Sequence, residues 1–274
     1  MRALARLPLD KAAFCEKFGP WAVIAGASEG TGECYARALA KMGLNLVLVS
    51  RRQPALEALG DVLKAEYGIA YRAFAQDLTE PGAGLRIVEA AAGLDVGLYI
   101  SNAGADGFTR FFEDDVGAAH RLVRMNISTL IDAANGFGRA FLARGKGGMI
   151  VMASGAGLGG QPNLALYSAT KAFEINFAES LWAEYHARGI DVIAIAAPIM
   201  RTPMLLRTVP AGFDVSDVYD PADVTHNALA GLLAGEPLQI VPDGPGLEKQ
   251  PQVQADRKAR LVGFVEFNKK FTGG

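Results

Sequence analysis

The chain has 274 residues, of which 50% are hydrophobic and 20% are charged, and its formal net charge is −2. A chain of this length and composition can form one α/β domain with a large core. The small net charge and the lack of a Lys/Arg-rich block argue against nucleic-acid binding and against adhesion to anionic membranes. The sequence therefore predicts small-molecule partners.

The cysteines and histidines indicate no metal site. Cys15 and Cys34 fall in separate predicted helices, so neither a disulfide framework nor a thiolate site is expected. His120, His186 and His226 share no metal-ligand spacing with Asp or Glu. No run approaches the roughly 18 apolar residues of a membrane span, and the first 18 residues lack the continuous apolar core of a signal peptide. We expect a cytoplasmic protein with no transmembrane segment.

Short apolar runs alternate with segments of helical periodicity along the chain. The runs lack strict alternation, which is the pattern of strands buried on both faces of a parallel sheet. The sequence predicts an α/β fold in which a doubly wound parallel sheet of about seven strands carries helices on both faces, in a single domain. The predicted strands are residues 21–25, 46–50, 71–75, 96–101, 149–153, 192–197 and 238–241.

Three segments depart from this alternation. Residues 1–18 are predicted to be an N-terminal helical extension of the main domain at 19–245, and residues 246–274 a helical tail with an amphipathic helix around 257–270. The long connection at 199–220 is expected to be a mobile substrate lid, because connections of that length are usually functional or mobile. Its apolar residues are expected either to contact substrate or to pack the lid onto the core; they are Met200, Met204, Leu205, Leu206, Val209, Phe213 and Tyr219.

A glycine-rich turn follows the first predicted strand and opens into the helical pattern at 33–41. Its sequence is Gly26-Ala27-Ser28-Glu29-Gly30-Thr31-Gly32. Glycines at such a turn let the backbone approach a pyrophosphate, whose charge is favoured at a helix N-terminus. A lone turn of this kind can be a mere tight connection. Its place between the first strand and the first helix favours a dinucleotide site.

Tyr167 and Lys171 lie four residues apart in Tyr-Ser-Ala-Thr-Lys, so on a helix they share one face. A Lys ammonium beside a phenol favours the phenolate, and such a tyrosine can act as a catalytic base. This spacing alone is common by chance. Ser154, which precedes Tyr167 by 13 residues, and Asn126 lie where they complete the pattern, so the four residues together indicate an oxidoreductase.

Over roughly residues 18–245 the chain resembles the classical short-chain dehydrogenases/reductases, whose fold is of the Rossmann type. More narrowly, the stretches that begin at Lys17, Gly43 and Gly93 are similar to the branch of hydroxysteroid dehydrogenases and long-chain 3-oxoacyl-coenzyme A reductases. The family resemblance rests on Gly26, Gly30, Gly32, Asp77, the Ser-Asn-Ala-Gly stretch at 101–104, Asn126, Ser154, Tyr167, Lys171, Pro198 and Thr202.

The resemblance implies a role for each matched residue. Tyr167 is expected to act as general acid/base, with Lys171 on the nicotinamide ribose. Ser154 is expected to donate a hydrogen bond to the developing alkoxide, and Asn126 to hold a water near Lys171. The expected catalytic residues are Asn126, Ser154, Tyr167 and Lys171, and the expected cofactor-binding residues are Gly26, Ser28, Glu29, Gly30, Thr31, Gly32, Ser50, Arg51, Asp77, Leu78, Asn102, Ala103, Gly104, Tyr167, Lys171, Pro198 and Thr202.

The end of the second predicted strand bears on cofactor choice. A preference for NAD normally uses an Asp or Glu there, whereas a 2'-phosphate requires a cation and no carboxylate. Ser50 and Arg51 can bind a phosphate, so we expect NADP(H). Two readings oppose this: Arg51 and Arg52 can simply be a solvated helix start, and Glu29 stands where some NADP-dependent relatives carry a basic residue.

The expected function is that of an NADP(H)-dependent oxidoreductase that interconverts a ketone and a secondary alcohol on a bulky apolar substrate, steroid-like or acyl-chain. The alternatives are a cofactor-binding regulatory or scaffold protein with little turnover and, within the enzyme class, a short polar substrate. The resemblance also implies a homodimer or homotetramer. Ala25, Ser101 and Ile199 depart from the family pattern, and Ile199 fills space near the expected nicotinamide position.

Overall fold

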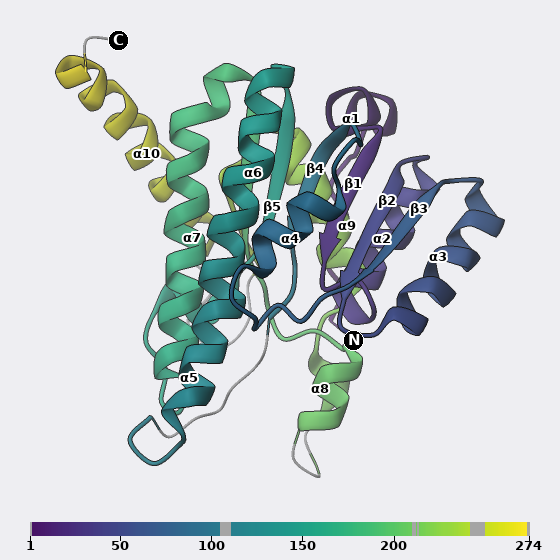
Figure 1. Cartoon of the computed structure of the whole chain (residues 1–274). Coiled ribbons are helices and arrows are strands. Elements are labelled where there is room, and N and C mark those ends of the chain that lie inside the picture. Colours follow the sequence, from purple (N-terminus) through teal and green to yellow (C-terminus); the bar gives the residue numbers. More distant parts are fainter. Residues whose placement is uncertain (1, 105–110, 210–211, 213, 242–249, 273–274) are drawn as a thin grey trace.

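A single parallel sheet organises the molecule (Figure 1). The computed structural model describes residues 2–104, 111–209, 212, 214–241 and 250–272. Its seven strands have the order β3-β2-β1-β4-β5-β6-β7, which confirms the predicted doubly wound α/β fold. The strands are β1 (Trp21–Ala25), β2 (Asn45–Ser50), β3 (Tyr71–Ala75), β4 (Val96–Ser101), β5 (Gly147–Met152), β6 (Ile190–Ala196) and β7 (Leu238–Ile240).

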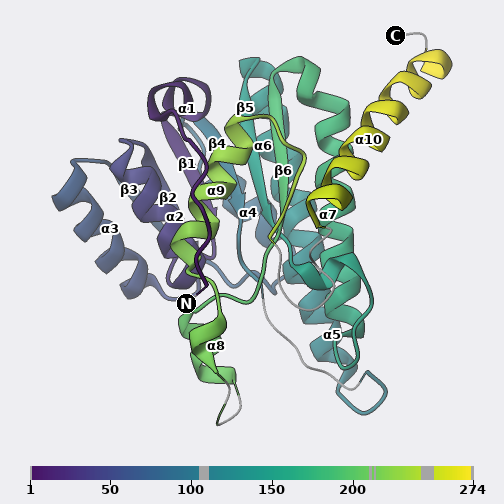
Figure 2. The ribbon, with the colours of Figure 1, turned by 180° about the vertical axis from the view of Figure 1, so that it is seen from behind.

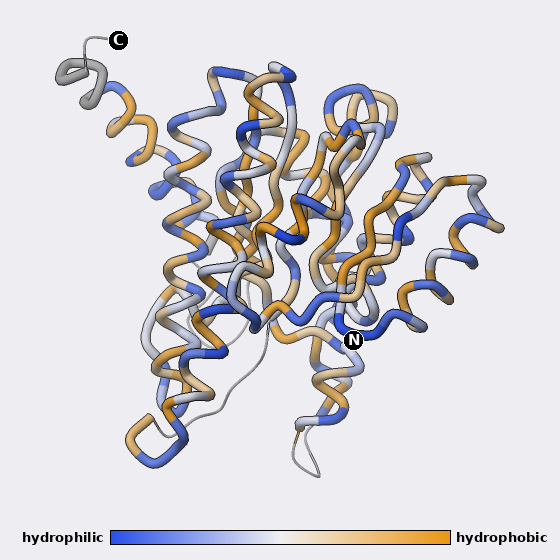
Figure 3. Tube along the Cα trace, in the orientation of Figure 1, coloured by the Kyte–Doolittle hydropathy of each residue, from blue (hydrophilic) through white to orange (hydrophobic). Residues whose placement is uncertain are grey.

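The central strands are buried on both faces, as their unbroken apolar runs predict. All seven residues of β6 are buried. Within β1, Val23 contributes to one core cluster and Ile24 to the other, because successive side chains point to opposite faces. In Figure 3 the strands are mostly coloured hydrophobic, and hydrophilic colour gathers on the outer helices.

Helices cover both faces of the sheet (Figures 1 and 2). The core of one face contains Leu39 and Leu229, from α2 and α9, and the core of the other contains Phe137 and Trp182, from α6 and α7. The helices are α1 (Lys11–Phe18), α2 (Gly30–Lys41), α3 (Gln53–Tyr67), α4 (Ala83–Ala90), α5 (Val116–Val123), α6 (Thr129–Arg144), α7 (Ala165–Tyr185), α8 (Pro203–Thr208), α9 (Pro221–Leu233) and α10 (Gln250–Thr272), with short turns η1 (Arg124–Ser128), η2 (Gly155–Leu158), η3 (His186–Arg188) and η4 (Val215–Asp217).

The N-terminal extension is helical over only part of the predicted segment. Asp10 caps α1 by accepting a hydrogen bond from the Ala13 amide at 3.1 Å, which sets where the helix begins. The preceding residues lie along α9 instead. There the Asn227 side chain accepts from the Leu7 amide at 2.8 Å and donates to the Ala5 carbonyl at 2.9 Å.

The described residues of the predicted lid include the short helix α8 and the turn η4. α8 begins after Thr202, whose Oγ1 accepts a hydrogen bond from the Leu205 amide, and a parallel bridge joins Met200 to Tyr219. In Figures 1 and 2, α8 lies beyond the carboxyl ends of the strands. Residues 210–211 and Phe213 of the predicted lid lie outside the described residues.

The tail helix α10 begins at Gln250, earlier than the predicted start near residue 257. It packs against α7 and β7 and then extends away from the sheet (Figure 2). The boundary predicted at 245/246 falls outside the described residues. Among the residues searched, no helix is both long and apolar enough to cross a membrane.

Candidate active site

The topology brings the predicted site residues to one edge of the sheet. β1 lies between β2 and β4, and the chain turns in opposite directions from it, so the loops after β1 and β4 flank a crevice at the carboxyl ends of the strands. The loop after β1 is the glycine-rich turn, and the loop after β4 carries Asn102 and Gly104. The end of β5 leads to Ser154, and the end of β6 leads to Thr202.

The glycine-rich turn packs directly on the loop after β4. Gly26 has φ +88°, and a Cβ there would lie 2.8 Å from Ala103 Cα. A Cβ on Gly32 would overlap the Gly26 carbonyl oxygen, so side chains are excluded where the two segments meet. Asn102 fixes the contact: its Nδ2 donates to Gly26 O at 3.0 Å, and its Oδ1 accepts from Thr31 Oγ1 at 2.7 Å.

A cavity of about 1020 Å³ lies over this floor. Its size and the exposed N-terminus of α2 fit an extended dinucleotide. The cavity does not include Gly32, Asn126, Ser154, Tyr167, Lys171 or Pro198 among its lining residues, although Leu166, next to Tyr167, does line it. The predicted residues that line it are Gly26, Ser28, Glu29, Gly30, Thr31, Ser50, Arg51, Asp77, Leu78, Asn102, Ala103, Gly104 and Thr202.

Tyr167 and Lys171 share a face of α7, as their spacing predicts. The Lys171 Nζ lies 5.7 Å from the centroid of the Tyr167 ring, and Lys171 is buried whereas Tyr167 is half-buried. Nζ donates to the Met152 carbonyl at 2.9 Å. Ser154 follows β5, and its Oγ accepts a hydrogen bond from the Ala156 amide at 3.2 Å, which leaves its hydroxyl proton for another acceptor.

Asn126 lies in η1, a single π-helical turn between α5 and α6, and is buried. Such turns occur often at functional sites. Its Nδ2 donates to Thr170 Oγ1 at 3.0 Å, and that hydroxyl donates to the Tyr167 carbonyl at 2.8 Å, so η1 is tied to α7. The Asn126 Oδ1 is buried with no hydrogen-bond partner among the described residues. The Asn126 Oδ1 can therefore accept a hydrogen bond from a polar group that lies between η1 and α7.

The family model for short chain dehydrogenases matches residues 20–211 of this sequence. The chain belongs to the short-chain dehydrogenase/reductase family. Members of this family are oxidoreductases that act on hydroxyl and keto groups with nicotinamide cofactors. The family assignment made from the motifs is confirmed.

Two curated relatives confirm the narrower branch. A 7beta-hydroxysteroid dehydrogenase of Mediterraneibacter gnavus is 32% identical over 230 residues, which cover 82% of this chain and 87% of the relative. A very-long-chain 3-oxoacyl-CoA reductase of Macaca fascicularis is 31% identical over 206 residues, which cover 71% of this chain and 66% of the relative.

Two solved structures share the fold over most of their length. A short-chain dehydrogenase from Sphingobium yanoikuyae in complex with NADPH has a TM-score of 0.78 and 30% identity, and the match covers 90% of this chain and 95% of that chain. A bulky-bulky ketone specific alcohol dehydrogenase from Comamonas testosteroni has a TM-score of 0.75 and 28% identity, with coverage of 89% and 94%.

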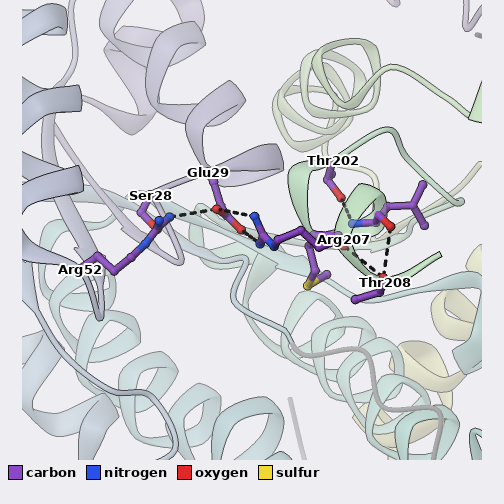
Figure 4. Close-up of polar contacts among 8 residues, drawn as sticks. Ser28, Glu29, Arg52, Thr202, Arg207 and Thr208 are labelled. Carbon is purple, nitrogen blue, oxygen red and sulfur yellow. Dashed lines mark hydrogen bonds and ion pairs between the residues drawn. The ribbon is translucent and has the colours of Figure 1, made fainter. Parts of the chain in front are cut away.

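Within this dehydrogenase, Glu29 joins three segments around the cavity (Figure 4). Arg52, from the end of β2, donates to Glu29 Oε2 at 2.9 Å and approaches Ser28 Oγ at 3.4 Å. Arg207 of α8 donates to both carboxylate oxygens. The hydrogen bond from Arg207, together with both guanidinium charges, holds the pKa of Glu29 below its usual value although partial burial opposes this. We call Glu29, Arg52 and Arg207 the Glu29 network.

The Glu29 network weakens the argument that Glu29 disfavours NADP(H). Glu29 does not face the cavity as an unpaired carboxylate, because two guanidinium groups neutralise it and leave an excess positive charge. Arg51 also lines the cavity. There Asp77 accepts from the Thr79 amide at 2.9 Å, and this bond, with the Thr79 hydroxyl and the Arg51 charge, lowers the pKa of Asp77 against the effect of burial.

The sequence reasoning did not single out Arg207 or Glu174. Arg207 is separated from Glu29 by 178 residues, so no local sequence pattern predicts that the two side chains are in contact. Glu174 is a buried charged residue on α7 and forms an ion pair with Lys171. Its spacing of three residues from Lys171 could have indicated it, because residues at that distance are neighbours on a helix.

Proposed function

We propose that this protein is an NADP(H)-dependent oxidoreductase that interconverts a ketone and a secondary alcohol on a bulky apolar substrate. The observation that carries the proposal is the placement of Tyr167 and Lys171 on one face of α7, beside the floor formed by the glycine-rich turn and the loop after β4. A cofactor-binding protein without turnover has no chemical need for the Tyr167 hydroxyl beside Lys171.

The chain's own groups have distinct proposed roles. Tyr167 would exchange a proton with the substrate oxygen, and the Lys171 ammonium would favour its phenolate form and bind the cofactor ribose. The Ser154 hydroxyl would donate to the same oxygen as negative charge develops on it, which is commonly worth about 3 kcal/mol in the transition state. The bound nicotinamide cofactor would supply or accept the hydride.

The choice of NADP(H) and of an apolar substrate has separate support. For the cofactor, Ser50 and Arg51 line the cavity at the end of β2, no carboxylate follows that strand, and the S. yanoikuyae relative was solved with NADPH. For the substrate, Met204 of α8 lines the cavity, and the C. testosteroni relative is described as specific for bulky-bulky ketones. The assembly as a homo-oligomer, a cytoplasmic location and the domain limits at 18/19 and 245/246 remain predictions.

A substrate screen tests the proposal. Purified protein is incubated with NADPH or NADH and a panel of ketones that runs from small and polar to steroid-like and long-chain, and cofactor oxidation is followed by absorbance. The matching alcohols are run with NADP⁺ and NAD⁺. We expect turnover of bulky ketones with NADPH. Tight NADPH binding with no turnover across the panel would favour the regulatory alternative instead.

A further inference from the structure

Glu174 lies one turn after Lys171 on the same face of α7, and its carboxylate approaches the Lys171 ammonium. Its Oε1 and Oε2 accept hydrogen bonds from Lys171 Nζ at 3.1 and 2.8 Å. Only 4% of Glu174 and 3% of Lys171 is exposed to solvent. Because water reaches neither charge, each depends on the other for its compensation.

The same contacts fix where the ammonium group lies. In this structure Nζ donates to the Glu174 carboxylate and to the Met152 carbonyl at the end of β5. A Cβ built on Gly104 would lie 3.4 Å from Nζ, so the loop after β4 closes over the group. The Lys171 ammonium is therefore held between β5, the loop after β4 and the Tyr167 ring.

Fold stability alone does not account for a carboxylate at this position. A buried ion pair is often no more stabilising than well-packed apolar residues of similar volume. The effect of this carboxylate on the charge of Lys171 gives a reason for its presence. Burial acts to lower the pKa of Lys171, but the Glu174 charge, the Tyr167 charge and the Glu174 hydrogen bond together outweigh burial, and the pKa is raised above its usual value. Without the carboxylate, burial would favour the neutral amine.

We propose that Glu174 is a positioning residue of the active site, which keeps the Lys171 ammonium charged and directed between β5 and Tyr167. This inference rests on the proposed oxidoreductase function. Glu174 acts through Lys171 and does not line the cavity. The charge that Tyr167 needs is thereby retained at a buried position.

The other ionisable groups that interact with the pair, among the described residues, are Tyr99 on β4 and Tyr167 on α7. Burial raises the pKa of Tyr99, so that phenol stays neutral through the range of an assay. Burial also raises the pKa of Glu174 to about 7, although Lys171 opposes the rise. At alkaline pH the Glu174 charge therefore opposes loss of the Lys171 proton.

Glu174→Gln tests the inference, because it keeps the side-chain size and removes the charge. Two quantities are measured between pH 6 and 10: kcat/KM for the best ketone, and the calorimetric affinity for NADPH, which needs no turnover. We expect the alkaline loss of both to begin at least about one pH unit lower than in the wild type, so that values there fall about tenfold or more. Near pH 6 the loss should be much smaller.

A matched control comes from the same helix. Glu179 is also 4% exposed and is paired with Arg257, but it has no contact with Lys171. Glu179→Gln should leave the shape of both pH profiles unchanged, even if it lowers stability. Glu174→Asp, which keeps the charge on a shorter side chain, should give profiles between those of the wild type and Glu174→Gln.

The outcomes separate this inference from the proposed function. An unshifted alkaline limb in both measurements, or the same shift in Glu179→Gln, would overturn the role of Glu174. If Glu174→Gln does not fold, Glu174→Asp decides, and an unshifted limb in that variant overturns the role. Absence of turnover with every ketone, together with a shifted NADPH profile, would refute the proposed activity while the role of Glu174 stands.

Discussion

At the residue scale, the Tyr167 hydroxyl is the one group that the proposed chemistry cannot lose. Tyr167→Phe keeps the ring beside Lys171 and removes the exchangeable proton. We expect turnover to fall by about 10²- to 10⁴-fold, the usual contribution of general acid/base catalysis. NADPH affinity should stay within a few-fold of the wild type, as measured by calorimetry. A variant that retains more than about a tenth of wild-type turnover, with chemistry rate-limiting, would show that another group carries the proton.

Arg51 tests the cofactor choice at the same scale. Arg51→Asp removes a cation from the cavity wall and places a carboxylate at the end of β2, where it can bind ribose hydroxyls. Since a charge-assisted hydrogen bond contributes about 1.5 to 3 kcal/mol, NADPH affinity should fall about ten- to a hundredfold and NADH affinity should fall less or rise. Arg37→Leu, whose partner Glu33 lies on the same exposed helix face, is the control. Equal wild-type affinities for the two cofactors would contradict the assignment.

Sequence patterns pointed to Tyr167 and Lys171, but they missed Arg207, whose partner is distant, and also Glu174, although it lies only three residues from Lys171. Tyr167 and Lys171 share a helix, so their spacing already implies their proximity. Arg207 depends on how α8 sits over the glycine-rich turn, which no local pattern encodes. Arg52 was considered only as part of a solvated helix start, and in the structure it is paired with Glu29.

At the scale of elements, α8 is the part of the lid that borders the cavity. Of the lid's apolar residues, Met204 lines the cavity, whereas Leu205 and Leu206 do not and Leu206 is 48% exposed. Met204→Ala should therefore raise KM for a bulky ketone by about five- to thirtyfold, the loss expected for about 1 to 2 kcal/mol of apolar contact. KM for a small ketone should change little. Leu206→Ala is the matched control, and equal effects of the two variants on both substrates would leave only a packing role.

The Glu29 network links α8 to the glycine-rich turn and gives a second prediction for this element. Both arginine side chains are 58% exposed, so each ion pair should contribute no more than about 1 kcal/mol. In Arg207→Leu we expect the α8 amides to exchange hydrogen up to about fivefold faster, with the exchange of α2 and β1 unchanged. Arg37→Leu should leave α8 exchange as in the wild type. Unchanged α8 exchange in Arg207→Leu would mean that contacts such as the bridge between Met200 and Tyr219 hold the lid without the network.

For the whole molecule, the positions of the strands and their parallel arrangement were predictable because each strand is a short apolar run bounded by polar or turn residues. The residues at which the strands and helices begin and end were less predictable. β5 begins at Gly147, before the apolar residues, because backbone pairing of Gly147 with Ile190 continues the ladder. The N-terminal residues before Lys11 read as helical but pair with α9, since Asn227 supplies both a donor and an acceptor to their backbone.

The tail offers a test of whether α10 belongs to the folded unit. Arg257 on α10 donates from Nε to the Glu179 carboxylate on α7 at 2.8 Å, and Glu179 is buried. Arg257→Met keeps much of the packing and leaves that carboxylate without its cation, so the free energy of unfolding should fall by about 1 to 3 kcal/mol. Urea denaturation followed by tryptophan fluorescence, to which the buried Trp182 on the same helix and Trp21 contribute, measures the loss.

The double variant Arg257→Met/Glu179→Gln removes the uncompensated charge, so it should be more stable than Arg257→Met alone if the pair is the cause. An unchanged denaturation midpoint in Arg257→Met would mean that α10 is not coupled to the main fold. Loss of the tail would then leave the sheet and the site on α7 intact. A lowered midpoint that the second substitution partly restores would instead make α10 a structural part of the same cooperative unit as the active-site helix.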